Sequence, residues 1–317
     1  MTLHELTAQY VGIKRAAGTD FTSAAQLLSA LCRVVGGGAA IGAIRDEHLR
    51  AFLAGRGPLT RYWHRKHSVL LGFYRYAVSR GYLAALPSVL AARPPKAPPA
   101  CAPYLYTREE IRRLLDATAR YQKQRFHLSP HTFRTLLLML YGAGLRISEA
   151  LQLTLADVDL AAAVLTIRDT KFYKTRLVPL GPDLQQVVQA YAAERRTPRW
   201  PQGPAAAFFV DRTGSPLLAG TVRRAFGRLR ACAGVARTDG ARYPPRLHDF
   251  RHTFTVHRLT AWYREGADVQ QCLPRLATYL GHLNLAATQV YLTMTPELLH
   301  EAARRFEHYA RKEDYDE

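Results

Sequence analysis

Four residues in the last quarter of the chain have side chains suited to chemistry on a phosphate. His248 and Arg251 are three residues apart, a spacing that places two side chains on one face of a helix. His282 follows, and Tyr291 lies nine residues after it. Two imidazoles, a guanidinium and a phenol can bind an anion and move protons, so we expect this stretch to act on a phosphate group.

A second set of charged residues precedes this stretch. Arg146 follows a glycine turn in an apolar neighbourhood, where an unpaired charge would be costly. Glu149 lies one helical turn on, and it either pairs with Arg146 in a structural role or orients it towards a ligand phosphate. Lys171 and Lys174 lie with Arg176 at the tip of an expected hairpin, where a cation on a flexible loop could protonate a leaving oxygen.

A metal site is the rival interpretation of the histidines. His248 and His252 have the i, i+4 spacing of helical zinc ligands, and an acid, Asp249, follows the first of them. However, Arg251 would place a cation beside the metal, and no third ligand is evident. We therefore expect no metal at these histidines.

The charge of the chain indicates a polyanionic partner. The formal net charge of the 317 residues is +19, and residues 1–100 hold 13 Lys and Arg against 4 Asp and Glu, so both halves are basic. This favours a clamp on double-stranded DNA over a basic surface kept only for solubility. The four cysteines form no CxxC pair, and no signal peptide or membrane span is evident, so we expect a cytoplasmic protein that does not associate with a membrane.

Residues 1–86 are predicted to form a bundle of four helices, because apolar residues recur there at helical spacing. The fourth helix, residues 60–80, carries Arg61, Arg65 and Lys66. We favour contact between these cations and DNA phosphates over a face that is merely solvated. Lys174 and Arg176, at the expected hairpin tip, are predicted to bind DNA as well. The prolines of residues 87–104 cannot occupy a helix interior, so this segment is predicted to be a linker.

Residues 105–317 are predicted to form a second domain that is mainly helical, with a small antiparallel sheet and a C-terminal helix, so the whole chain is of the α+β class. Val164–Ile167 and residues 176–180 are short β-branched runs at the separation of a hairpin. Residues 208–210 are a candidate third strand.

The order and spacing of these signals resemble the tyrosine recombinase (phage integrase) family. The matching stretches, in chain order, read GAGLRISEALQLTLADVDL, TKFYKTRLVPLG, LHDFRHTF and YLGHLNLAATQVYLTM. The resemblance covers about residues 105–300, and the N-terminal helices resemble the core-DNA-binding domain of the family. The two-domain layout is similar to that of the simple Xer-type recombinases.

The resemblance implies a role for each residue. Arg146 and Arg251 would clamp the non-bridging oxygens of the scissile phosphate, with Glu149 supporting Arg146. Lys171 would protonate the leaving 5′ oxygen. Since the expected tip reads TKFYK rather than the glycine-rich form of many relatives, Lys174 is a second candidate for that lysine.

The remaining roles implied by the resemblance concern proton transfer and attack. His248 would transfer protons, His282 would hydrogen-bond the phosphate, and Tyr291 would attack to give a 3′-phosphotyrosyl link and a free 5′ hydroxyl. This link conserves the energy of the phosphodiester, so the resemblance implies no need for ATP, a metal or another cofactor. The implied activity is site-specific recombination or integration of DNA, including transposition, by a homotetramer on two synapsed sites, alone or beside companion recombinases. The alternatives are a type IB topoisomerase-like relaxing enzyme and a non-catalytic DNA-binding protein.

Overall fold

The computed structural model describes residues 1–55, 59–98, 102–120, 128–168, 175–282, 284, 286–293 and 299–304. The chain divides into two compact units, Met1–Ala100 and Cys101–Glu317. In the described ranges, no helix is both long and apolar enough to cross a lipid bilayer.

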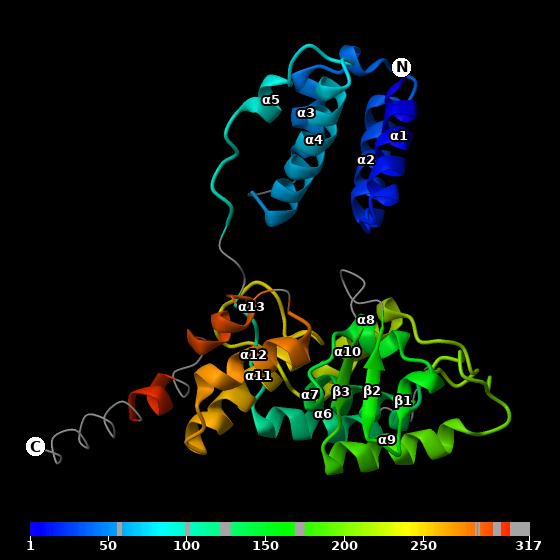
Figure 1. Cartoon of the computed structure of the whole chain (residues 1–317), viewed down its shortest axis with the longest axis vertical. Coiled ribbons are helices and arrows are strands. Elements are labelled where there is room, and N and C mark those ends of the chain that lie inside the picture. Colours follow the sequence, from blue (N-terminus) through cyan, green and yellow to red (C-terminus); the bar gives the residue numbers. More distant parts are fainter. Residues whose placement is uncertain are drawn as a thin grey trace, which may run out of the picture. The chain divides into compact units, whose positions relative to one another are not determined.

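The N-terminal unit is helical (Figure 1). Its elements are α1 (Leu3–Ala16), α2 (Thr22–Val35), a 3-10 turn (Ile41–Ala43), α3 (Asp46–Leu53), α4 (Arg61–Ser79) and α5 (Ser88–Ala91). Thr2 and Glu5 form a capping box that satisfies free amide groups at the start of α1. Leu28, Leu70 and Phe73 are fully buried where α1, α2 and α4 pack together, so the apolar stripes of these helices form the core.

The start of the expected linker packs onto this unit. Within residues 87–104, Ser88–Ala91 form the short helix α5, and Leu90 is 2% exposed in the core of the N-terminal unit. The apolar side chain of Leu90 holds this short helix against the bundle. The proline content of the segment does not predict this contact.

The second unit is built of helices around a small sheet. In chain order its helices are α6 (Arg108–Arg120), α7 (Pro130–Gly142), α8 (Ile147–Gln152), α9 (Pro182–Arg195), α10 (Ala219–Cys232), α11 (Asp249–Arg264), α12 (Val269–Leu280) and α13 (Ala286–Gln289). The 3-10 helix η4 (Val290–Thr293) follows α13 directly.

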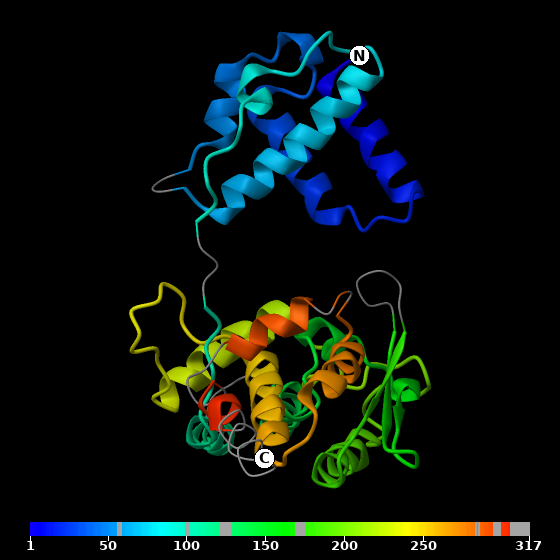
Figure 2. The ribbon, with the colours of Figure 1, turned by 60° about the vertical axis from the view of Figure 1, so that its left-hand side comes forward.

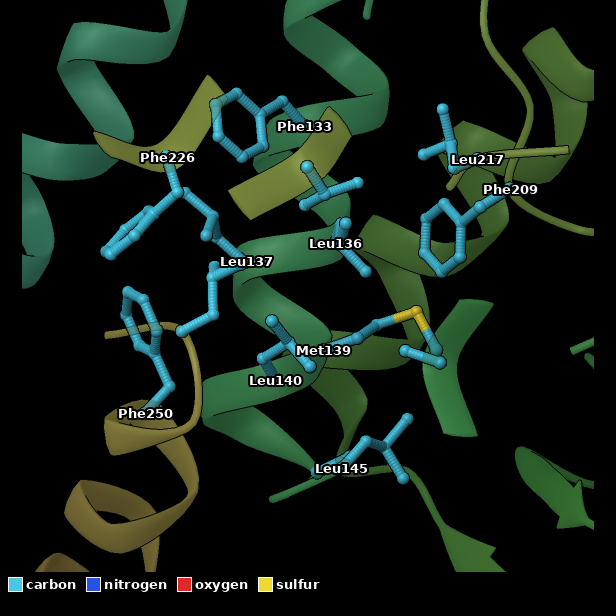
Figure 3. Close-up of a cluster of buried hydrophobic side chains, with 14 of the residues drawn as sticks. Phe133, Leu136, Leu137, Met139, Leu140, Leu145, Phe209, Leu217, Phe226 and Phe250 are labelled. Carbon is cyan, nitrogen blue, oxygen red and sulfur yellow. The ribbon is translucent and has the colours of Figure 1, made fainter. Parts of the chain in front are cut away.

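Helix α7 forms the centre of this unit. Its side chains lie between Phe226 and Phe250 on one side and Phe209 and Leu217 on the other (Figure 3). All four of these partners are buried, and each large apolar side chain removed from water contributes about 1.5–3 kcal/mol. The helices that carry the site are therefore fixed on a well-packed core.

The sheet has three antiparallel strands in the order β1 (Val158–Asp159), β2 (Val164–Ile167) and β3 (Arg176–Pro179). Val164 pairs with Pro179 and Ile167 with Arg176, so the predicted hairpin is present, while its tip lies outside the described residues. The prediction of a third strand at residues 208–210 is wrong: Val210 makes only an isolated bridge to Pro216, and the third strand is β1. Figure 2 shows α12 beside the sheet, where it contacts β3.

Candidate active site

The turn that leads into α8 places Arg146. Gly144 has φ +59°, and a Cβ there would lie 2.6 Å from a ring carbon of Phe254, so only glycine fits. Arg146 is the N-cap residue of α8, and its backbone amide donates to Glu149 Oε2 at 2.9 Å. Arg146 Nη1 donates to Oε1 of the same carboxylate at 2.6 Å, which holds the guanidinium with its side chain 30% exposed.

Glu149 joins three arginines from separate elements. It is 6% exposed and accepts two hydrogen bonds from Arg176 of β3, at 3.0 and 2.8 Å. Arg251 Nη1 lies 3.9 Å from Glu149 Oε2. Burial alone would raise the pKa of Glu149, but the hydrogen bonds and charge of Arg176, and then those of Arg146, hold it at about 2.

Arg251 is the most deeply buried of the three arginines. It projects from α11, is 1% exposed, and donates to the carbonyl oxygens of Gly144 at 2.8 Å and of Leu280 at 2.5 Å. Burial and then the charge of Arg146 lower the pKa of Arg251 to about 9. Three guanidinium groups around one carboxylate leave an excess of positive charge, which suits the binding of an anion.

The end of α12 brings His282 to this cluster. Gly281 ends the helix in the left-handed conformation, at φ +66°, and its carbonyl accepts from Arg146 Nη2 at 3.2 Å. His282 Nδ1 lies 2.7 Å from Oγ1 of the fully buried Thr288. Burial and then the charges of Arg251 and Arg146 lower the pKa of His282 to about 4, so the imidazole is neutral near pH 7.

Tyr291 lies on η4 among these groups. It is 5% exposed, and its ring is parallel to that of His282, with an interplanar angle of 3° and a centroid separation of 6.3 Å. Its hydroxyl lies 2.7 Å from His252 Nδ1 on α11. Burial raises the pKa of Tyr291, and the charges of Arg251 and then Arg146 oppose that increase.

His248 immediately precedes α11 and is exposed. Its ring meets that of His252 edge to face at a centroid separation of 4.7 Å. The packing around the ring, followed by the charge of Arg251, lowers the pKa of His248. The site therefore holds an imidazole at its solvent side and a phenol in its interior.

Comparison with known proteins assigns the family. Residues 105–297 match the model described as the phage integrase family. The chain belongs to that family. It is a tyrosine-type site-specific recombinase, an enzyme that exchanges DNA strands.

Two relatives in Sinorhizobium fredii (strain NBRC 101917 / NGR234) illustrate the similarity. The chain is 40% identical to the putative integrase/recombinase y4rB over 78% of each protein. It is 35% identical to the putative integrase/recombinase y4rE over 96% of this chain and 95% of that protein. The fold is also similar to that of a lambda integrase solved as a tetramer bound to a Holliday junction, with a TM-score of 0.65 and 18% identity over 90% of this chain and 78% of that one.

The recombinase structure brings five of the predicted site residues together with Glu149. They are Arg146, His248, Arg251, His282 and Tyr291. Lys171 and Lys174 lie outside the described residues. Among the residues that the structure does describe, no group of three His, Cys, Asp or Glu side chains converges as a metal site.

The predicted DNA-binding residues fall into two kinds. Arg61 and Arg65 on α4 are exposed, whereas Lys66 is half-buried and donates to the Phe52 carbonyl at 2.6 Å. Arg176 is predicted to contact DNA, but its side chain is 9% exposed and its two Nη atoms are bound to Glu149. The Arg176 side chain therefore holds Glu149 in the interior and is not part of the exposed surface.

His252 lies in the site, but the sequence predicts no role for it other than that of a zinc ligand. A signal is available, because His252 lies one helical turn after His248 and directly follows Arg251. What the sequence does not reveal is that the phenol of Tyr291 meets it, 39 residues along the chain.

Proposed function

We propose that Tyr291 is the nucleophile of this recombinase and forms a 3′-phosphotyrosyl link, releasing a 5′ hydroxyl. The observation that supports this most strongly is the position of the phenol, which lies in the interior of a site that also holds Arg251 and His282. A phosphate bound there would face guanidinium groups that can stabilise the charge developing on it. The phosphotyrosyl link keeps the energy of the phosphodiester, so rejoining needs no external energy source.

The other proposed roles follow from the same arrangement. Arg146 and Arg251 would bind the non-bridging oxygens, for which planar guanidinium groups suit better than ammonium groups. Glu149 would hold Arg146 in place, His282 would donate a hydrogen bond to the phosphate, and His248 would transfer protons at the solvent side. Lys171 remains the proposed donor to the leaving oxygen, with Lys174 as the second candidate.

Covalent trapping tests the nucleophile directly. A library of nicked duplexes with randomised cores is incubated with the wild-type protein and with Tyr291→Phe, and covalent adducts are recovered under denaturing conditions and sequenced. We expect adducts that share a core sequence with the wild type and none with Tyr291→Phe. Adducts that persist in Tyr291→Phe would refute the assignment of Tyr291, and efficient relaxation of plasmids without the core sequence would indicate a topoisomerase.

We further propose that the chain acts on double-stranded DNA as a homotetramer, alone or beside companion recombinases, in the cytoplasm. The tetrameric lambda integrase with the same fold supports this assembly. We also propose that the chain beyond Tyr291 docks on a neighbouring protomer and so couples cleavage to assembly. We therefore expect deletion of residues 296–317 to abolish synapsis, measured as the mass of the complex with two sites; unchanged recombination by the truncated protein would contradict this proposal.

A further inference from the structure

We propose that His252 is the proton acceptor for Tyr291: it takes the phenolic proton as the tyrosine attacks the phosphate and returns it when the strand is rejoined. This inference rests on the proposed role of Tyr291 as nucleophile. It assigns to a specific atom, His252 Nδ1, a step that the resemblance to the family leaves to His248 in general terms.

The geometry places the acceptor at the reacting atom. His252 Nδ1 and the Tyr291 hydroxyl oxygen are 2.7 Å apart, a normal hydrogen-bond distance that needs no rearrangement for proton transfer. Tyr291 is 5% exposed, so bulk water has little access to its hydroxyl. The Thr255 hydroxyl also interacts with the phenol, but it donates to the Arg251 carbonyl at 2.8 Å, and a hydroxyl is too weak a base to hold a second proton at neutral pH.

The surroundings of His252 keep its ring neutral, as an acceptor must be. Burial, and then the neighbouring His248, lower the pKa of His252 to about 4, while Asp249 acts in the opposite direction. Arg246 and Arg251 also disfavour the charged ring. The negative charge of a bound DNA phosphate would raise this pKa, so binding of the substrate brings the base closer to the range in which it works best.

The atoms and charges balance in both directions. In cleavage, the Tyr291 O–H bond breaks, the proton passes to His252 Nδ1, and the phenolic oxygen forms a bond to phosphorus. The bond from phosphorus to the 5′ oxygen breaks, and that oxygen takes a proton from a cationic donor, proposed above to be Lys171 or Lys174. In rejoining, the 5′ hydroxyl attacks phosphorus and returns its proton to the same lysine. The bond from phosphorus to the phenolic oxygen breaks, and that oxygen takes back the proton held by His252.

Two matched variants distinguish proton transfer by His252 from mere positioning of the Tyr291 phenol. In His252→Asn, the amide lies near the position of ring Nδ1 and can bond the phenol, but it cannot accept a proton near pH 7. His257→Asn is the control, because His257 lies on the same helix and its Nδ1 is 2.9 Å from the Tyr141 hydroxyl, an equivalent contact outside the site. Both variants are compared with wild type and Tyr291→Phe on a nicked duplex recovered from the library.

Single-turnover cleavage at saturating DNA is the measurement. We expect His252→Asn to cleave about 10²–10⁴-fold more slowly at unchanged DNA affinity, and His257→Asn to stay within about twofold of wild type. Replacing Tyr291 by 2,3-difluorotyrosine, whose phenol is more acidic, should reduce the His252→Asn defect by at least about tenfold, because the nucleophile then ionises without a strong acceptor.

Three outcomes are decisive. A His252→Asn variant that cleaves within about threefold of wild type overturns the proposal. A defect of the same size with tyrosine and difluorotyrosine also overturns it, since His252 would then only position the phenol. Cleavage by Tyr291→Phe would instead refute the proposed nucleophile, so the failure of the two proposals can be told apart.

Discussion

Arg176 and Glu149 form a two-pronged ion pair across 27 residues of chain, with Nη1 bound to Oε1 at 3.0 Å and Nη2 to Oε2 at 2.8 Å. Both side chains are less than 10% exposed. Arg176 also donates from Nε to the Tyr279 carbonyl at 2.9 Å, so one side chain links β3, α8 and α12. Because Arg146 also donates to Glu149, this ion pair holds Arg146 in position.

This pair predicts a specific pH dependence of stability. The pKa of Glu149 falls from an ordinary 4.5 to about 2 on folding, so its ionised form stabilises the fold. The contribution, on the order of 3 kcal/mol, is fully present above about pH 4.5 and is lost as the pH falls towards 2. Urea unfolding at several pH values should show this loss in wild type and in Glu109→Gln, an exposed control, but not in Glu149→Gln. An equal slope in all three proteins would contradict it.

Lysine cannot replace Arg176 without loss. A single ammonium cannot occupy both prongs of the pair, so Arg176→Lys should lower the free energy of unfolding by about 1–3 kcal/mol. It should also slow cleavage, because Arg146 shares the same carboxylate. Affinity for DNA and its dependence on salt should stay near wild type. A clear loss of affinity with normal stability would instead support the prediction that Arg176 contacts DNA.

Gly281 should tolerate no side chain. A Cβ there would lie 2.9 Å from Arg176 Nη1 in a backbone conformation that already favours glycine. Gly281→Ala should therefore destabilise the protein by more than the ~1 kcal/mol expected from backbone strain alone, and it should impair cleavage. Gly266→Ala is the matched control, because Gly266 has φ +73° and a Cβ added there would meet nothing within 4 Å. Equal effects of the two substitutions would exclude the contact with Arg176 as the cause.

The exposed cations of α4 should contribute to DNA affinity. If Arg61 and Arg65 each neutralise one phosphate, each alanine variant should reduce the slope of log affinity against log salt by about 1. The variants should cleave slowly only below saturating DNA, since the chemical site lies in the second unit. Arg33→Ala, an exposed cation on α2, serves as the control. Unchanged slopes would favour a solvated basic face.

The identity of the lysine can be settled with a modified leaving group. A substrate with sulfur in place of the bridging 5′ oxygen needs no proton donor, because a thiolate leaves readily. We expect Lys171→Ala to cleave normal DNA about 10²–10⁴-fold more slowly and to recover on the sulfur substrate. Lys174→Ala should show a small defect on both. The reverse pattern would assign the role to Lys174.

The side chains available for catalysis can be identified from the amino-acid sequence. The side chains of Arg146, His248, Arg251, His282 and Tyr291 are specified residue by residue, and their local spacing follows from helix geometry. The basic charge and the helical periodicity are likewise properties of the chain alone. These signals are sufficient to predict the family, the mainly helical fold and the central hairpin.

Which polar groups pair with one another depends on how the elements pack in three dimensions. Arg176 is predicted to bind DNA because a cation on a hairpin tip could reach into a groove, whereas packing of β3 against α12 encloses its side chain with Glu149. His252 meets Tyr291 because α11 and η4 are packed together, 39 residues apart in the chain. Such pairings depend on burial and on contacts between distant elements, and local spacing carries no information about either.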